Sequence, residues 1–165
     1  MGLVEQLANL QDKGIPVAHV APIEEIQQHL LIAKEHLADA RRRDNSLVTR
    51  FSVAYAAGHA LLMAAIKING FRTTSEKGHR AILYQILDVL LPGAAGAKEP
   101  LLRANNTRNK AEYDGDAVDV TQGQVDDVID AVKNVSEEVE HLFRNFKSRK
   151  KIRVKPRSTN DRSHQ

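Results

Sequence analysis

The feature that most constrains this chain is the spacing of its apolar residues, which recur every three or four positions along most of its 165 residues. That spacing gathers apolar side chains on one face of an α-helix, whereas a half-buried strand needs strict alternation. Strand signals are nearly absent, and aromatic residues make up 4% of the chain. The pattern predicts an all-α fold, an up-and-down bundle of four or five helices.

Start and stop signals divide the apolar pattern into helices. Pro22 and Pro100 suit first helical turns, Asn69-Gly70 is a stop, and Thr121 with Gln124 forms a capping box. Small residues crowd the second helix, which predicts a close approach to its neighbours. The predicted helices are 22–43, 46–68, 74–91, 100–115 and 121–146, with a loop over 92–99.

Composition predicts one domain with two unlike ends. We expect an N-terminal arm over 1–21, a helical domain over 22–146 and a flexible basic tail over 147–165. From Arg144 to Arg162 nine Lys and Arg face a single acid, so the rest of the chain is net acidic. Such a tail is typical of nucleic-acid contact, and a merely solubilising tail is the alternative.

Several classes of protein are disfavoured by what the sequence lacks. There is no cysteine, no signal peptide, no P-loop and no dinucleotide fingerprint, and no stretch reaches the roughly 18 apolar residues of a membrane span. His29 and His36 lack the spacing of a zinc helix. We therefore expect a soluble cytoplasmic protein with no metal, no cofactor and no membrane contact.

The densest polar pattern lies in the predicted helix 100–115. Asn105, Arg108, Asn109 and Glu112 are spaced to share one stripe, and Tyr113 follows one turn after Asn109. The planar fork of Arg108 suits a phosphate, and the asparagines can donate to the same anion. The alternative is a solvated face on which Glu112 pairs with Arg108. Asparagine is a poor helix former, which favours a binding site.

Two segments resemble a known family in their order and spacing. Residues 50–83 read RFSVAYAAGHALLMAAIKINGFRTTSEKGHRAIL, and residues 108–115 read RNKAEYDG. The first is similar to a long helix of aromatic and small residues followed by a loop and a Gly-His-Arg helix start. The second is similar to a signature helix with Arg, a polar residue and, five positions after the Arg, His. Over about residues 22–146 the chain resembles the HEPN superfamily (higher eukaryotes and prokaryotes nucleotide-binding).

The resemblance implies a HEPN-like helical homodimer in which the signature helices of two protomers face one cleft. In active relatives that cleft cuts RNA without metal, as Arg holds the phosphate, His transfers a proton and the 2′-hydroxyl of the RNA attacks. Carried over, Arg108 matches the Arg, Asn109 the polar residue and Tyr113 the His. Tyrosine, with a reference pKa of about 10, is a poor base at neutral pH but can donate a proton.

Further residues are expected on the RNA side, some from the stripe, some from the resembling segment and some from the basic tail. They are Asn105, Glu112, His59, His79, Lys150 and Lys151. Within this set His59 and His79 are candidates to supply a proton from elsewhere in the cleft, because Tyr113 stands where the family has its histidine.

Three functions remain open at this point. The first is a metal-independent endoribonuclease of a prokaryotic toxin–antitoxin or phage-defence system, acting through Arg108, Asn109 and Tyr113. The second is a non-catalytic nucleotide- or RNA-binding module, an antitoxin-like partner of a toxin or of a nucleotidyltransferase. The third is a structural helical protein whose polar stripe is only solvated.

Overall fold

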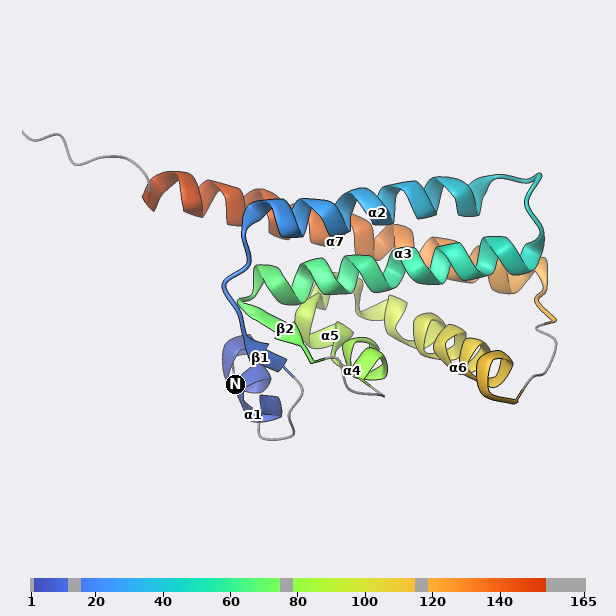
Figure 1. The fold of residues 1–165 in the computed structure, drawn as a ribbon, viewed down its shortest axis with the longest axis horizontal. Coiled ribbons are helices and arrows are strands. Elements are labelled where there is room, and N and C mark those ends of the chain that lie inside the picture. Colours follow the sequence, from blue (N-terminus) through green and yellow to red (C-terminus); the bar gives the residue numbers. More distant parts are fainter. Residues whose placement is uncertain (1, 12–15, 75–78, 115–118, 154–165) are drawn as a thin grey trace, which may run out of the picture.

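A computed structural model describes residues 2–11, 16–74, 79–114 and 119–153 (Figure 1). Apart from connecting turns and loops, this part of the chain is helical with one two-stranded sheet, which confirms the all-α prediction. The elements are α1 (Leu3–Gln11), β1 (Pro16–Ala18), α2 (Ile23–Arg41), α3 (Leu47–Ile68), β2 (Phe71–Thr73), α4 (His79–Gln85), α5 (Leu87–Leu90), the 3-10 helix η1 (Pro92–Ala97), α6 (Lys98–Asp114) and α7 (Gln122–Arg153).

The long helices α2, α3 and α7 lie side by side, and α6 packs beneath α3 (Figure 1). Helix α3 runs opposite to α2 and α6 and in the same direction as α7. It contacts all three, and it is buried on nearly every side. A helix that is apolar all round belongs in the centre of a fold, and the sequence of α3 satisfies that condition.

The small residues of α3 allow the close approach that the sequence predicts. A Cβ atom at Gly58 would lie 3.2 Å from Cγ2 of Val132 in α7 and 3.3 Å from Cδ2 of Leu101 in α6. Three helices therefore meet at Gly58, and its missing side chain sets their separation. The same contact aligns the helices: position 58 of α3 is level with 101 of α6 and 132 of α7.

Side chains cap two of the helices, and the second of these caps was predicted from the sequence. The Ser46 hydroxyl accepts a hydrogen bond from the Thr49 amide at 3.2 Å and so opens α3. The Thr121 hydroxyl accepts from the Gln124 amide at 3.2 Å, and the Gln124 side chain accepts from the Thr121 amide at 2.9 Å. This reciprocal pair is the capping box that opens α7.

The buried Arg50 connects three helices by hydrogen bonds at one end of the fold. Its Nε donates to the Ala40 carbonyl at 2.8 Å, in the last turn of α2, and its Nη1 donates to the Gln122 side chain at 3.2 Å, at the start of α7. A cation on the carbonyl end of a helix is favourable because that end carries partial negative charge. One side chain of α3 thus contacts both the last turn of α2 and the first turn of α7.

Four features differ from the sequence prediction. The predicted helix 74–91 is not continuous: α4 and α5 are separated at Ile86, and β2 precedes them. The arm contributes β1, which pairs antiparallel with β2, Val17 opposite Arg72. The predicted loop after Leu91 is η1, and α6 begins at Lys98. Helix α7 continues to Arg153, so the first residues of the predicted tail are helical, while 154–165 lie outside the described residues.

Contrary to the prediction that no stretch is apolar enough, the helix α3 is long and apolar enough to cross a membrane. By length and composition Leu47–Ile68 is the one candidate among the described residues, and 67% of its 18-residue window is buried inside the fold. Such burial is expected of a central core helix, since its apolar surface is covered by α2, α6 and α7.

Candidate functional site

The polar stripe of α6 does not lie wholly in solvent. Asn105 is one of its members, and only 5% of it is exposed. The hydroxyl of Tyr55, itself 1% exposed, donates a hydrogen bond to Oδ1 of Asn105 at 2.7 Å. A buried amide is costly without a partner, and Tyr55 supplies one across the α3–α6 contact.

Arg108 lies against the same tyrosine. Its Cζ is 4.9 Å from the centroid of the Tyr55 ring, and Tyr84 of α4 stacks on that ring at 5.5 Å with an interplanar angle of 29°. Helical side chains lean toward the N-terminus, so Arg108 reaches back to the level of Asn105. Stacking on an aromatic face orients a guanidinium while leaving its charge in place. We call Tyr55, Tyr84, Asn105 and Arg108 the tyrosine cluster.

The remaining signature residues follow along α6. Asn109 is exposed, on the surface next to the tyrosine cluster. Helix α6 is unbroken through Asp114, so Arg108 and Tyr113 keep their five-residue spacing on one helix. The side chains of Glu112 and Tyr113 lie outside the described residues.

His59 lies away from the signature residues because α3 and α6 run in opposite directions. Tyr55 is level with Asn105, and Gly58 is level with Leu101. His59 therefore lies toward the start of α6, and Asn109 toward its end. At 1.5 Å per residue, the backbone positions of His59 and Asn109 are about 12 Å apart along the helix axes. The side chain of His79, the other histidine candidate, lies outside the described residues.

Lys150 and Lys151 lie far from Arg108. Ala104 of α6 and Val128 of α7 line the same cavity of about 230 Å³, so these two residues lie at the same height along the fold. Lys150 lies 22 residues after Val128 on the unbroken helix α7. Over that length a helix rises about 33 Å. The structure thus brings Asn105 and Arg108 together and places the basic end of α7 at the other end of the molecule (Figure 1).

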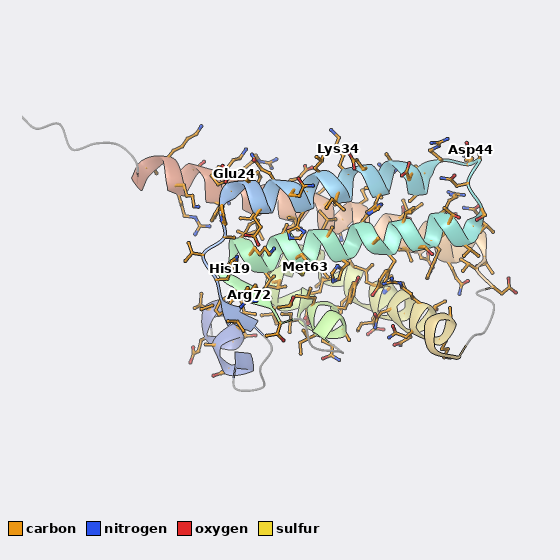
Figure 2. The ribbon with its side chains drawn as sticks, in the orientation of Figure 1. His19, Glu24, Lys34, Asp44, Met63 and Arg72 are labelled. Atoms are coloured by element: carbon orange, nitrogen blue, oxygen red, sulfur yellow. The ribbon has the colours of Figure 1, made fainter. Side chains whose placement is uncertain are left out.

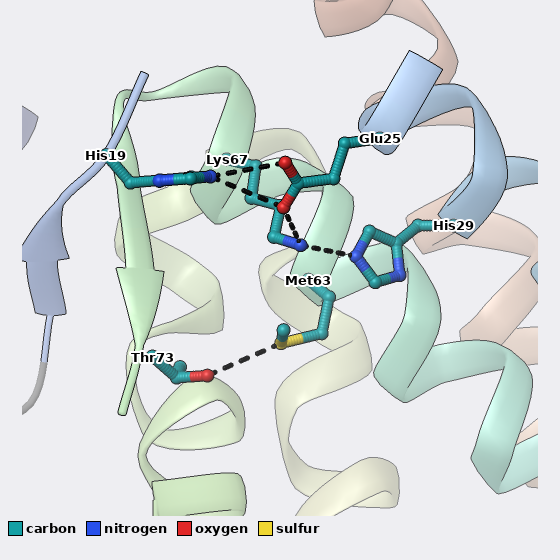
Figure 3. A network of polar contacts seen from close by, with 6 residues as sticks. All are labelled: His19, Glu25, His29, Met63, Lys67 and Thr73. Atoms are coloured by element: carbon teal, nitrogen blue, oxygen red, sulfur yellow. Dashed lines mark hydrogen bonds and ion pairs between the residues drawn. The ribbon is translucent and has the colours of Figure 1, made fainter. Parts of the chain in front are cut away.

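A second polar cluster was missed by the sequence analysis (Figure 3). The Glu25 carboxylate forms an ion pair with Lys67, and Nε2 of His19 lies 3.3 Å from each of its oxygens. The Lys67 ammonium also contacts Nε2 of His29 at 2.8 Å. An ammonium only donates, so His29 accepts through a deprotonated Nε2. We call His19, Glu25, His29 and Lys67 the lysine cluster.

Two pKa values in the lysine cluster are displaced, each for a physical reason. The hydrogen bond from Lys67, followed by that from His19, lowers the pKa of Glu25 because both favour the carboxylate. Burial, followed by the positive charge of Lys67, lowers the pKa of His29 because both disfavour the imidazolium. The cluster is therefore built around an ionised Glu25 and a neutral His29.

The sequence held one partial signal for this cluster. Glu25 and His29 are four residues apart on α2 and share a face, but Lys67 comes from the far end of α3. Such a long-range contact has no signature in a single sequence. In the part of the chain that the structure describes, no three His, Asp or Glu side chains come together as a set of metal ligands.

Comparison with known proteins assigns no family to this arrangement. No protein-family model matches the chain, and no curated protein or solved structure is significantly similar to it.

Proposed function

We propose that this chain is an RNA-directed protein of the HEPN type, an up-and-down helical bundle that forms a homodimer and binds the RNA backbone through Arg108 and Asn109. The observation that carries the proposal is the position of Arg108 over the buried ring of Tyr55. An arginine held in one orientation has less conformational entropy to lose when a phosphate binds.

The neighbours of Arg108 favour a binding site over a solvated stripe. A solvated stripe needs no buried asparagine, yet Asn105 is buried and hydrogen-bonded to the residue that orients Arg108. Asn109 is exposed at the next position and can donate to a phosphate that Arg108 holds. Because the body of the chain is net acidic, RNA binding there depends on a localised cation rather than on the field of the whole protein.

A second candidate is metal-independent RNA cleavage, as part of a prokaryotic toxin–antitoxin or phage-defence system. It is favoured by the unbroken α6, which keeps Tyr113 five residues after Arg108, the spacing at which the resembling family has its histidine. In a dimer cleft Arg108 would hold the scissile phosphate and Asn109 would orient it. The 2′-hydroxyl of the RNA would attack the phosphorus and lose its proton to water, so that a 2′,3′-cyclic phosphate forms and the bond to the 5′ oxygen breaks. Tyr113 would then donate a proton to the leaving oxygen, since tyrosine is protonated at neutral pH.

The deciding experiment compares Arg108→Ala with Arg103→Ala on a set of single-stranded and hairpin RNAs in the presence of EDTA. Arg103 is an exposed arginine of the same helix that lines the cavity facing α7, so its removal changes the charge equally. We expect Arg108→Ala to weaken RNA binding about tenfold, the loss of one charged contact, and Arg103→Ala to have little effect.

Three further results separate the candidates. Cleavage that survives EDTA and is lost in both Arg108→Ala and Tyr113→Phe identifies the nuclease. Binding without turnover identifies the non-catalytic module, whose partner would be a toxin or a nucleotidyltransferase. Equal RNA binding by wild type and Arg108→Ala, with both proteins folded by circular dichroism, contradicts the proposal and leaves the tyrosine cluster a structural feature.

A further inference from the structure

Two hollows adjoin at the end of the molecule where α3 and α7 terminate. One, of about 300 Å³, lies between β1, the end of α3 and α7, and the other, of about 430 Å³, lies along α7. They share Ile68, Phe146 and Lys150 as lining residues. We call this continuous surface the α7-end groove.

Large aliphatic side chains stand exposed on the α7-end groove. Val20, which lines the first hollow, is 92% exposed, and Ile152, which lines the second, is 75% exposed. Among the large hydrophobic residues of the described chain these are the two most exposed. Their position in two adjoining hollows marks a surface suited to a partner, since scattered single hydrophobics would need no explanation.

The Lys and Arg side chains that line the α7-end groove make its charge positive. Arg149 and Lys150 line it together with Lys67, whose charge is largely offset by Glu25. The Lys150 ammonium lies 4.8 Å from the centroid of the Phe146 ring and so keeps its charge above an apolar floor. Neither hollow is lined by Asp or Glu among the described residues. The occupant must therefore be both anionic and aliphatic.

We propose that the α7-end groove binds a segment of another protein that carries Asp or Glu beside Leu, Ile or Val. The C-terminal residues 154–165 of the chain itself are unsuited, because Lys155, Arg157 and Arg162 outnumber Asp161. A bilayer is unsuited because a flat surface does not fill hollows. RNA gains little from aliphatic side chains, and the ring of Phe146 is already covered by Lys150.

This site is independent of the proposed RNA site. The α7-end groove and Arg108 are separated by roughly 30 Å of helix, so a protein partner at one leaves the other open. Recognition would combine burial of aliphatic side chains in the hollows with a rim of charge pairs, which set orientation and association rate more than affinity.

The test is a selection of displayed random peptides on the full-length protein. Wild type is compared with Lys150→Glu/Ile152→Ser, which changes only two side chains of the groove. The matched control is Lys34→Glu/Leu31→Ser on the outer face of α2, where Lys34 points away from the fold and Leu31 is 50% exposed (Figure 2). The most enriched peptide is then titrated into all three proteins by fluorescence anisotropy.

We expect wild type and control to enrich peptides that combine acidic and aliphatic residues. The groove variant should bind the selected peptide about 30-fold more weakly, and the control within about twofold of wild type. The proposal is overturned if no such peptide is enriched, or if the groove variant binds it as well as wild type does.

Competing occupants are tested in parallel with an oligouridine RNA, phosphatidylglycerol vesicles and the molar mass of the free protein. If the groove variant loses RNA or vesicle binding while peptide selection fails, the occupant is a different one and the proposal is wrong. Conversion of a dimer to a monomer by the groove variant alone would assign the groove to a second copy of the chain, and would likewise overturn it.

Discussion

The tyrosine cluster and the lysine cluster both depend on α3, yet they hold a cation in opposite ways. Arg108 is oriented by the face of an aromatic ring, and the hydroxyl of that ring is fixed by Asn105. Lys67 is held by a carboxylate and by the lone pair of a histidine. The ring face orients the guanidinium and carries no charge of its own, whereas the carboxylate of the lysine cluster offsets most of the ammonium charge that it orients.

In the proposed function Arg108 contacts an anion, whereas the lysine cluster only stabilises the fold. Glu25 and His29 belong to α2 and Lys67 to α3, while His19 precedes α2, so the lysine cluster ties the arm and two helices together (Figure 3). The tyrosine cluster joins α3, α4 and α6 by uncharged contacts and presents Arg108 at its edge. The lysine cluster is thus held by a carboxylate and two imidazole rings, and the tyrosine cluster by two stacked phenol rings and a buried amide.

The largest effect on the free energy of unfolding is expected when the hydroxyl of Tyr55 is removed. Tyr55→Phe keeps the ring under Arg108 but leaves the amide of Asn105 buried without its partner, which should lower the free energy of unfolding by about 1–3 kcal/mol. RNA affinity should stay unchanged, since the ring that orients Arg108 remains. Urea denaturation and an RNA titration measure the two quantities.

The double variant Tyr55→Phe/Asn105→Leu is the control for that interpretation. Replacing both partners with apolar groups of similar size removes the unsatisfied amide, so most of the lost stability should return. If the double variant is less stable than the sum of the single changes predicts, the hydrogen bond is not what the single change removed.

A smaller effect is expected from Lys67→Met, which keeps the aliphatic length but removes the ammonium. Glu25 loses its strongest partner and His29 its donor. Because Glu25 is partly exposed and can be solvated instead, the cost should be only about 1 kcal/mol in urea denaturation. Lys34→Met, on the exposed face of α2, serves as the control and should stay within about 0.5 kcal/mol of wild type.

The smallest effect is the contribution of the lysine cluster to the dependence of stability on pH. His29 has a lowered pKa in the folded state, so below about pH 6.5, its ordinary value, the unfolded chain binds more protons than the folded one. Stability should therefore fall as the pH drops below 6.5. Glu25, with its pKa also lowered, adds a second loss below about pH 4.5.

The variant His29→Gln isolates the first of these two steps. Glutamine keeps an acceptor for Lys67 but does not titrate, so the difference in unfolding free energy between pH 7.5 and pH 5.5 should shrink relative to wild type. An unchanged difference would show that groups other than His29 produce the dependence.

Local chemistry explains which parts of the fold were predictable. The helices 22–43 and 46–68 were expected within two residues of the α2 and α3 ends, because caps, stops and the apolar period all act within one or two turns. The break at Ile86 and the pairing of β1 with β2 were missed. The sheet forms because the arm returns to the end of α3, and neither short strand has a pattern of its own.

The candidate site divides in the same way. The stripe on α6 was predictable from spacing, and so was the placement of Asn105 and Arg108 on one face. Which residue of the stripe is buried was not predictable, because Tyr55 reaches Asn105 from a helix whose register with α6 is set by Gly58 and Leu101. The separation of His59 from Asn109 has the same cause.

By itself the sequence determined the helical class of this protein, most helix ends, the capping box at Thr121 and the stripe that carries Arg108. Those features depend on interactions between residues a few positions apart, which a linear pattern records. Only the tertiary structure decided that Arg108 stacks on Tyr55, that Lys67 meets Glu25 and His29, and that the basic end of α7 lies far from α6. These contacts depend on how close-packed helices slide into register, and that is fixed by the fit of many side chains at once.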